Sequence, residues 1–455
     1  MDKREFLKSS GAIVAGSIVS RFASGQPKSQ PHAQQPAPHE NWAGNIHYST
    51  EHVHTPANLD EVRECVKKCS KLRALGSRHS FNRIADSNQN QVSLEKLNEI
   101  EIDEGSRTVT VGAGVRYGQL APVIDAKGFA LHNLASLPHI SVAGAIATAT
   151  HGSGIHNGNL ASVVRGLEIV TANGDVIHLA RDKDGDQFAA AVVGLGAVGV
   201  VSRVTLDLQP TFQVAQTVYQ DLSFSELEHN FDGIFGAGYS VSLFTDWQKH
   251  RATQVWIKRR LAADEKHNSP ELFYNAKRAT EKLHPITGHL AESCTEQMGV
   301  PGPWYQRLPH FKMEFTPSSG RELQTEYFVP RERGYEAILA VEKLKEKITP
   351  HLFVTELRTI AADNLWMSTA YQRDSLAIHF TWKPEWNVVK QILPQIEAQL
   401  KPFNPRPHWA KLFTIPPSQL QAQYVRLGEF KAFVKQHDPD GKFRNEFIES
   451  NLYKS

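Results

Sequence analysis

The stretch ASLPHISVAGAIATATHGSG, residues 135–154, contains no Asp, Glu, Lys or Arg and is made almost entirely of small residues. A solvated surface does not have this composition, so the stretch must be buried or must cover a ligand. Small residues let backbone N–H groups approach phosphate oxygens, and a helix beginning near Ser141 would direct its N-terminal dipole toward them. A tightly packed core helix has the same composition, and the residues alone leave both interpretations open.

A second glycine-rich stretch, GLGAVG at residues 194–199, matches the fingerprint of dinucleotide-binding folds. That fingerprint requires a strand before the glycines and a helix after them. Here the helix-prone DQFAAAVV comes first, at residues 186–193, and the β-branched VVSRVTLDLQP follows at residues 200–210. This order predicts a structural helix-to-strand turn and argues against a nicotinamide site.

The length and charge of the chain limit its organisation and its partners. The chain has 455 residues, which is enough for two domains. Lys and Arg number 50 and Asp and Glu number 48, so the net charge gives no reason to expect nucleic acid or an anionic membrane as a partner. We expect a monomer that acts on a small molecule.

The N-terminus has the layout of an export signal. Residues 1–25 place Lys3, Arg4 and Lys8 before an apolar run that is too short to span a bilayer. KREFLK resembles the twin-arginine signal, with Lys3 in place of the first arginine. The Pro- and Gln-rich residues 26–40 predict a disordered linker. We expect export to the periplasm and a mature protein with no membrane-spanning segment; an uncleaved tether or a cytoplasmic location is the alternative.

Three cysteines do not form a disulfide framework. Cys65 and Cys69 lie on a predicted helix, on one face with Val62 and Leu72, so we interpret them as small core residues, with a metal or redox role as the alternative. His52 and His54 could offer two ligands from one face of a strand, but the sequence shows no further ligand cluster beside them. We therefore expect no metal site.

LGSRHSFN at residues 75–82, the stretch 135–154 and GLGAVGVV at residues 194–201 together resemble the FAD-binding domain of the vanillyl-alcohol oxidase superfamily, within it the alditol oxidase and xylitol oxidase branch. The resemblance runs from residue 41 to the end. It implies an α+β, two-domain FAD-binding fold of the PCMH type. The FAD-binding domain would occupy residues 41–210. A mixed α/β substrate (cap) domain built on an antiparallel sheet would occupy residues 211–415, and a C-terminal segment, residues 416–455, would return to the FAD domain.

The same resemblance implies that FAD is bonded covalently to His79, through the 8α-methyl group of the flavin. GLGAVG then becomes a flavin-contacting turn. Arg78 stands where relatives often have glycine, which puts one local contact in doubt. The further flavin contacts that it implies are Gly76, Ser77, Arg78, Ser80, Phe81, Ser136, Ser141, Gly144, Thr148, Ala149, Thr150, His151, Val201 and His408.

In the second half of the chain, polar residues recur at strand spacing on an otherwise apolar pattern. Glu356 and Arg358 share one face of FVTELRTI, His379 and Thr381 share one face of LAIHFTW, and HWAKLFT places Lys411 in a third such segment. These side chains provide the paired donors and acceptors that adjacent hydroxyl groups require. A solvated sheet face with weak ion pairs has the same spacing. The proline- and aromatic-rich residues 294–332 are interpreted as scaffold, with one strand near Tyr327.

The segments ELRT, HFTW and RPHWAK resemble the substrate pocket of alditol oxidases. The resemblance implies that Ser136, Glu356, Arg358, Thr381 and Lys411 bind the substrate and that Arg358, Lys411 and His379 are catalytic. It predicts oxidation of the terminal hydroxyl of alditols such as xylitol or sorbitol to aldoses, with hydride transfer to flavin N5 and reoxidation by O2 to give H2O2. The alternatives are an aldono-1,4-lactone oxidase or dehydrogenase of the same superfamily and, outside it, a sugar-binding protein without redox chemistry.

Overall fold

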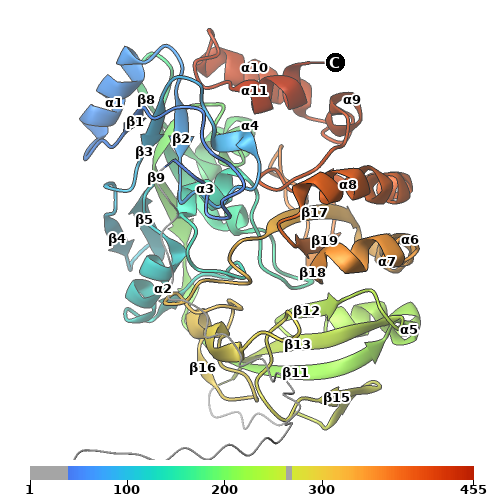
Figure 1. The fold of residues 1–455 in the computed structure, drawn as a ribbon. Coiled ribbons are helices and arrows are strands. Elements are labelled where there is room, and N and C mark those ends of the chain that lie inside the picture. Colours follow the sequence, from blue (N-terminus) through green and yellow to red (C-terminus); the bar gives the residue numbers. More distant parts are fainter. Residues whose placement is uncertain (1–38, 263–268, 455) are drawn as a thin grey trace, which may run out of the picture.

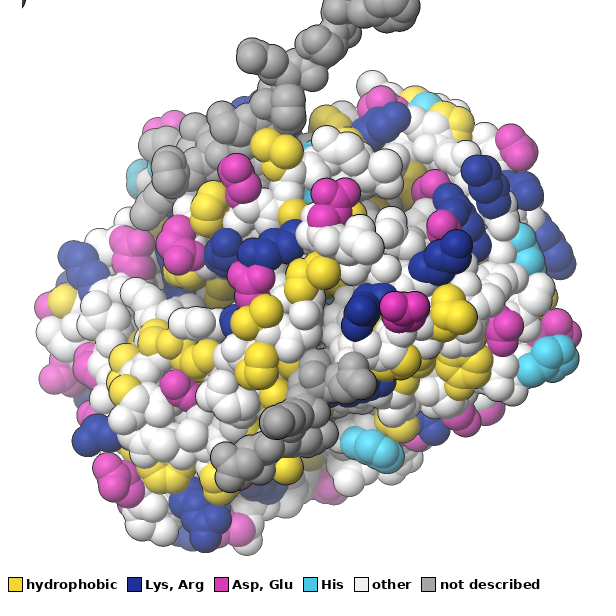
Figure 2. All heavy atoms as spheres, turned by 90° about the horizontal axis from the view of Figure 1, so that it is seen from below, with side chains coloured by type: hydrophobic (Ala, Val, Ile, Leu, Met, Phe, Trp, Pro, Cys, Tyr) yellow, Lys and Arg dark blue, Asp and Glu magenta, His cyan; other side chains and the backbone are white. Residues whose placement is uncertain are grey.

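The computed structural model describes residues 39–262 and 269–454. The predicted signal peptide and nearly all of the predicted linker lie outside the described residues. Within the part of the chain that the structure describes, none of the helices has both the length and the hydrophobicity needed to cross a bilayer. On the face seen in Figure 2, basic and acidic side chains alternate among apolar and polar ones, as a chain with 50 basic and 48 acidic residues leads one to expect.

The N-terminal part contains two sheets and the short helix that the charge-free stretch forms. Parallel strands in the order β1-β3-β2 make the first sheet, and antiparallel strands in the order β4-β5-β9-β7-β8 make the second. The strands are β1 (Val53–His54), β2 (Arg73–Leu75), β3 (Gln91–Ser93), β4 (Ile100–Asp103), β5 (Thr108–Gly112), β7 (Val164–Val170), β8 (Val176–Ala180) and β9 (Val200–Asp207), with β6 (Phe129–Ala130) pairing β10 (Gln209–Pro210). The helices are α1 (Leu59–Lys68), α2 (Tyr117–Asp125), α3 (Val142–Ala147) and α4 (Arg181–Val192).

Both glycine-rich stretches form the elements that the sequence predicts. Ser141 is the N-cap of α3, so a helix does begin there. GLGAVG lies between α4 and β9, which confirms the helix-to-strand order. Gly196 has a φ of 65°, a left-handed conformation that glycine adopts without steric cost.

A large antiparallel sheet dominates the second half of the chain. Its order is β14-β15-β11-β13-β12-β18-β19-β17-β20, with β16 pairing β11. The strands are β11 (Gln213–Ser223), β12 (Ser240–Thr245), β13 (Arg251–Leu261), β14 (Leu272–Phe273), β15 (Ala276–Arg278), β16 (Gly302–Pro303), β17 (Leu323–Pro330), β18 (Leu352–Ile360), β19 (Ser375–Trp382) and β20 (Arg406–Pro407). The strand predicted near Tyr327 is β17.

Helices cover one face of this sheet and leave the other face toward the N-terminal part. The covering helices are α5 (Phe224–Phe235), α6 (Gly334–Glu342), α7 (Lys345–Ile348) and α8 (Trp386–Leu400), and Figure 1 shows α6, α7 and α8 on the side away from β2 and α3. Large side chains such as Trp247, Phe380 and Trp382 are fully buried within the sheet's core. The uncovered face is therefore available for a site between the two parts of the chain.

The C-terminal residues pack back against the N-terminal part. The remaining helices are α9 (Pro417–Gln421), α10 (Leu427–His437) and α11 (Glu446–Ile448), and α10 and α11 lie beside the end of the molecule that holds α1 and β8 (Figure 1). Leu72 donates its backbone N–H to the carbonyl of Lys442 at 3.0 Å, and Asn445 Nδ2 donates to the carbonyl of Asp86 at 2.8 Å.

Arg73 on β2 joins three segments that are distant in the sequence. Its guanidinium is buried and donates to the carbonyls of Gly196 and Phe443, both at 2.7 Å, and to those of Ile84 and Leu195, at 2.5 and 2.9 Å. Burial lowers the pKa of Arg73 to about 10, so the group stays charged. One side chain therefore fixes the GLGAVG turn to β2 and to the C-terminal segment.

Replacing Arg73 by Leu should lower the free energy of unfolding by at least about 3 kcal/mol, because four buried carbonyls lose their donor. Denaturant unfolding followed by tryptophan fluorescence measures this loss. The matched control is Arg63→Leu, since Arg63 is more exposed and pairs with Asp60 at the surface. The Arg63→Leu variant should lose no more than about 1 kcal/mol of its free energy of unfolding. Equal losses in the two variants would contradict the role of Arg73 as a tie between segments.

Candidate active site

A deep cavity lies between the uncovered face of the large sheet and the loops of the N-terminal part. Its lining extends from the loop after β2 through α3 and the GLGAVG turn to β17, β18 and β19. A lining of this extent suits a long ligand together with a second small molecule. The predicted site residues that line it are Gly76, Ser77, Arg78, His79, Ser80, Phe81, Ser136, Ser141, Gly144, Thr148, Thr150, His151, Val201, Glu356, Arg358, His379, Thr381, His408 and Lys411.

Ala149, which the resemblance had implied as a flavin contact, is not among the lining residues. Its side chain is fully buried in the core and its φ is 55°. The left-handed backbone at Ala149 turns the chain after α3, so that Thr148 and Thr150 line the cavity while the residue between them does not.

Strand register assembles the cavity wall from the large sheet. Glu356 on β18 and Glu326 on β17 both lie opposite His379 on β19, so the three residues form one row across adjacent strands. His408 donates its backbone N–H to the carbonyl of Glu326 at 3.0 Å and extends the row. All four residues line the cavity. The period of two along each strand therefore places these polar side chains on a single surface.

A second row runs parallel to the first. Thr381 on β19 lies opposite Val354 on β18 and Gln324 on β17, and all three line the cavity. The polar segments that the sequence singled out are thus brought together with the polar face of β17, which the sequence pattern did not indicate. Lys411 comes from the loop after β20 and not from a strand, which corrects the expected strand spacing in HWAKLFT.

Glu326 is the centre of the charged groups in the cavity wall. Its side chain is fully buried; Oε1 accepts from Arg358 Nη2 at 3.0 Å and from His151 Nε2 at 3.1 Å, and Oε2 accepts from Lys411 Nζ at 2.6 Å. Burial opposes the ionisation of Glu326, but Lys411, His151 and Arg358 hold its pKa well below the usual range. The carboxylate therefore stays charged and fixes both cations.

Arg358 also reaches the N-terminal part of the chain. Its Nη1 donates to Ser136 Oγ at 3.1 Å, and its Nε lies 3.5 Å from Glu356 Oε1. Burial lowers the pKa of Lys411, against the opposing effect of Glu326. Two carboxylates, Glu326 and Glu356, thus face two cations, Arg358 and Lys411, so the charges in the wall balance.

Behind Glu356 lies a hydrogen-bonded chain to a buried lysine. His310 Nε2 donates to Glu356 Oε1 at 2.7 Å, and Lys258 Nζ donates to His310 Nδ1 at 3.0 Å. Burial lowers the pKa of Lys258 to about 7 and that of His310 to about 4. Lys258 is held in addition by the carbonyls of Leu308 and Pro309. The chain orients the carboxylate of Glu356 in the cavity.

His379 is the cavity residue best suited to accept a proton. Its Nδ1 lies 3.7 Å from Glu356 Oε2, while its Nε2 is buried without a hydrogen-bond partner. Burial lowers the pKa of His379 to about 4, so the imidazole is neutral near pH 7. A neutral imidazole with a free lone pair can take the proton of a bound hydroxyl group.

The loop after β2 has the features of a cofactor cradle. His79 Nδ1 donates to the carbonyl of Ser77 at 2.8 Å, its ring stacks on Trp42 with 5.4 Å between centroids, and its Nε2 is buried without a partner. Burial, with His139 nearby, lowers the pKa of His79 to about 3 and keeps its lone pair available. Arg78 has a φ of 62°, a left-handed conformation that favours glycine.

Glycines on both sides of Ser141 leave room beside this loop. A Cβ at Gly76 or at Gly144 would lie 2.8 Å from Ser141 Oγ, which is itself buried without a partner. An anionic ligand at the N-terminus of α3 would satisfy that hydroxyl group, so the residues fit a bound dinucleotide.

The structure corrects the interpretation of residues 294–332 as scaffold. This region supplies Glu326, Gln324 and His310, all of which line the cavity. Gln324 and Glu326 alternate with Leu323 and Tyr327, which is the same polar–apolar alternation as in ELRT and HFTW. Because prolines and aromatic residues surround this strand, the alternation was not recognised as a polar face.

Comparison with known proteins agrees with this architecture. A family model described as an FAD binding domain matches residues 50–180, and one described as D-arabinono-1,4-lactone oxidase matches residues 312–451. The structure of cholesterol oxidase from B. sterolicum is similar, with a TM-score of 0.74 at 15% identity over 95% of this chain and 99% of that chain. With the match to an FAD binding domain, this fold belongs to an FAD-dependent oxidoreductase.

The sequence relatives narrow this class. The chain is 46% identical to an alditol oxidase from a Streptomyces species over 417 residues, 90% of this chain and 98% of that protein. It is 28% identical to an L-gulono-1,4-lactone dehydrogenase from Mycobacterium tuberculosis over 90% of this chain and 97% of that protein. It is 27% identical to an L-gulonolactone oxidase from Mus musculus over 91% of this chain and 98% of that protein. The chain belongs to the alditol oxidase family of FAD-dependent, aldonolactone oxidase-like enzymes.

Replacing Glu326 by Gln should lower the free energy of unfolding by about 3–5 kcal/mol, because Arg358 and Lys411 become buried cations without their shared carboxylate. Equilibrium unfolding in denaturant measures the loss. Since the folded pKa of Glu326 lies below its ordinary value of 4.5, its contribution is complete above that value and is lost as the pH falls through the folded pKa. The loss should therefore be constant near neutral pH and shrink only in acid.

Glu322→Gln is the matched control. Burial raises the pKa of Glu322 to about 7, so this nearby carboxyl group is partly neutral already. We expect the Glu322→Gln variant to lose about 1 kcal/mol of its free energy of unfolding near neutral pH. A Glu326 variant no less stable than the Glu322 variant would show that the cations do not depend on Glu326.

Proposed function

We propose that this protein oxidises the terminal hydroxyl group of alditols such as xylitol and sorbitol to the aldose, with O2 as electron acceptor and H2O2 as second product. The observation that carries the proposal is the row of polar side chains on β17, β18 and β19 facing the cavity that the loop after β2 and α3 also line, in a chain 46% identical to an alditol oxidase. Bound FAD would supply the acceptor for the hydride from C1 of the alcohol and pass the electrons to O2.

We further propose that FAD is attached covalently through His79. In support, the imidazole is neutral, buried in the cavity wall, held by Ser77 and stacked on Trp42. A neutral imidazole has the lone pair that a bond to the 8α-methyl carbon would require; the methyl group would lose a proton, and the flavin would take up two electrons that O2 would then accept.

Substrate binding follows from the donors and acceptors that remain available. Lys411 uses one N–H on Glu326 and keeps two for hydroxyl oxygens, and Thr381 offers a hydroxyl group on the neighbouring row. Glu356 accepts from His310 through Oε1, which leaves Oε2 toward His379 and the cavity. A chain of adjacent hydroxyl groups matches this alternation of donors and acceptors, whereas a ligand without hydroxyl groups would leave buried polar atoms unpaired.

Proton removal is assigned to His379 and Arg358, whose side chains both lie beside Glu356. His379 Nε2 accepts the hydroxyl proton, while Arg358 donates to the same oxygen and stabilises the negative charge that develops as the proton leaves. Ser136 and Glu326 hold the guanidinium in place for this role. Lys411 adds positive charge to the same region when it is protonated.

The second candidate function is oxidation of an aldono-1,4-lactone. It is favoured by the family model described as D-arabinono-1,4-lactone oxidase and by the gulonolactone relatives. Those relatives are 28% and 27% identical, against 46% for the alditol oxidase, so the alditol remains the preferred substrate class.

The visible spectrum of the purified protein tests substrate, acceptor and attachment. Anaerobic xylitol should bleach the flavin absorption, and air should restore it with formation of H2O2. L-gulono-1,4-lactone should leave the spectrum oxidised; the reverse pattern would establish the lactone function. A colourless protein would overturn both redox functions. After acid precipitation the colour should stay with the wild-type protein and be released from His79→Ala.

Replacing Arg358 by Ala should slow anaerobic flavin reduction by alditol about 10²–10³-fold, because a positioned charge is lost where negative charge develops. Rapid-mixing spectroscopy at saturating substrate measures the rate. Arg333→Ala, at an exposed ion pair with Glu336, is the control and should reduce its flavin at the wild-type rate. If Arg358→Ala weakened substrate affinity alone and kept the reduction rate, the assigned role in the reaction would be wrong.

A further inference from the structure

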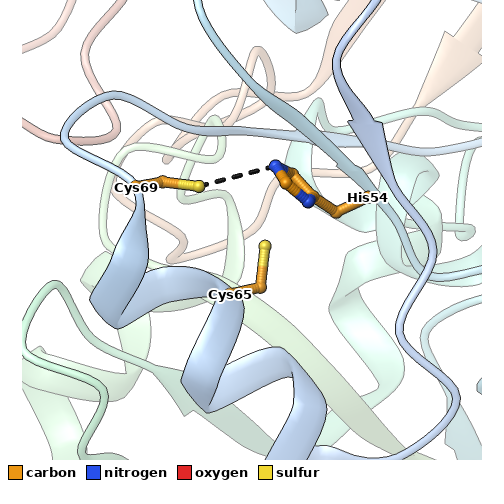
Figure 3. Close-up of side chains that lie close together, drawn as sticks. All are labelled: His54, Cys65 and Cys69. Atoms are coloured by element: carbon orange, nitrogen blue, oxygen red, sulfur yellow. Dashed lines mark hydrogen bonds between the residues drawn. The ribbon is translucent and has the colours of Figure 1, made fainter.

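Three side chains with metal-binding atoms meet outside the cavity described above. Figure 3 shows Cys65 on α1 and Cys69, the C-cap of that helix, pointing toward the ring of His54 on β1. The two sulfurs and one imidazole nitrogen all lie within 4.8 Å of one another, and Cys69 Sγ is 3.6 Å from His54 Nε2. None of the three lines the cavity. The sequence had suggested small core residues here, because the contact with His54 is made only in the folded chain.

The backbone around these side chains is fixed by contacts of its own. Asn58 caps α1 and accepts from the backbone N–H of Glu61 at 3.0 Å. Val62 and Val66 are fully buried in the core cluster that also contains Cys69. Cys69 donates its backbone N–H to the carbonyl of Cys65 at 3.1 Å, which places the two sulfurs one helical turn apart on one face.

His54 is brought to that face by strand pairing. It lies opposite Val92 in the parallel pairing of β1 with β3, and its ring is exposed to solvent. The three ligand atoms are therefore positioned before any ion arrives, with an open path for its entry.

The distances match a tetrahedral ion with thiolate and imidazole ligands. Zn–S bonds of about 2.3 Å and Zn–N bonds of about 2.0 Å at tetrahedral angles separate sulfur from nitrogen by about 3.5 Å. Cys69 Sγ and His54 Nε2 lie 3.6 Å apart, close to this separation. Asn90 Oδ1, 3.0 Å from His54 Nε2, stands beside the site as an oxygen ligand or as the acceptor for a bound water molecule.

We propose that His54, Cys65 and Cys69 form a binding site for one thiolate-preferring divalent cation of the Zn²⁺ type. Two thiolates and an imidazole favour Zn²⁺ over Mg²⁺ or Ca²⁺, which prefer oxygen ligands. On binding, both thiols release their protons to solvent and His54 binds through a neutral nitrogen. The ion ties β1 to the end of α1, and its role is structural because it touches no residue of the cavity.

Cobalt titration of the full-chain holoenzyme tests the site. The thiols are kept reduced, and the protein is treated with a chelator, freed of the chelator and titrated with Co²⁺, whose tetrahedral thiolate complexes have d–d bands at longer wavelengths than flavin absorption. We expect one equivalent to bind with these d–d bands, and Zn²⁺ to displace it. Cys65→Ser and Cys69→Ser should abolish the bands, and His54→Ala should weaken binding at least tenfold. The controls Cys294→Ala and His178→Ala should bind as the wild type does.

Two measurements on the unaltered protein keep the proposal testable if a cysteine variant folds poorly. Zn²⁺ should slow the alkylation of Cys65 but not of Cys294, and it should raise the thermal unfolding midpoint. Cobalt binding without the d–d bands, unchanged alkylation of Cys65, or a Cys65–Cys69 disulfide in the native protein would each overturn the proposal. Flavin content and turnover should not change with Zn²⁺, so failure here is distinct from failure of the proposed oxidase function.

Discussion

The buried carboxylate of Glu326 is the constraint on which the cavity depends. An isolated carboxylate in a site without solvent costs several kcal/mol, and the cost is offset only where cations and hydrogen bonds surround it. The surrounding hydrogen-bond donors are Arg358 on β18, Lys411 in the loop after β20 and His151 in the loop after α3. Because His151 belongs to the N-terminal part of the chain, the same interaction that orients the cations of the large sheet also fixes the sheet against the loops on the other side of the cavity.

The register of β17, β18 and β19 is what allows one carboxylate to serve both cations. Side chains on a strand alternate between faces, so a shift of one residue would move Glu326, His379 and Glu356 together from the cavity to the core. The helices on the other face prevent such a shift, since large apolar residues such as Phe380 and Trp382 are fully buried there. Packing on one side of the sheet thus determines the chemistry on the other.

The electrostatic arrangement separates the roles of the buried groups. Glu326 and Glu356 remain ionised because cations face them, whereas His379 and His79 remain neutral because burial lowers the pKa of each. A fixed positive group beside a neutral acceptor is what removal of a hydroxyl proton requires. Lys258, two hydrogen bonds behind Glu356, extends this arrangement into the core of the sheet.

The sequence by itself determined the helix that begins after Ser141, the helix-to-strand order at GLGAVG and the polar faces of FVTELRTI and LAIHFTW, because each follows from local composition or from the period of a single element. Only the tertiary structure decided that Glu326 joins those faces, that His310 and Lys258 stand behind Glu356, that Ala149 turns away from the cavity, and that His54 meets Cys65 and Cys69. Apart from the turn at Ala149, these are contacts between residues that are far apart in the chain or that lie on separate elements. Strand order, register and side-chain direction create these arrangements, and the residue spacing within one segment does not determine any of the three.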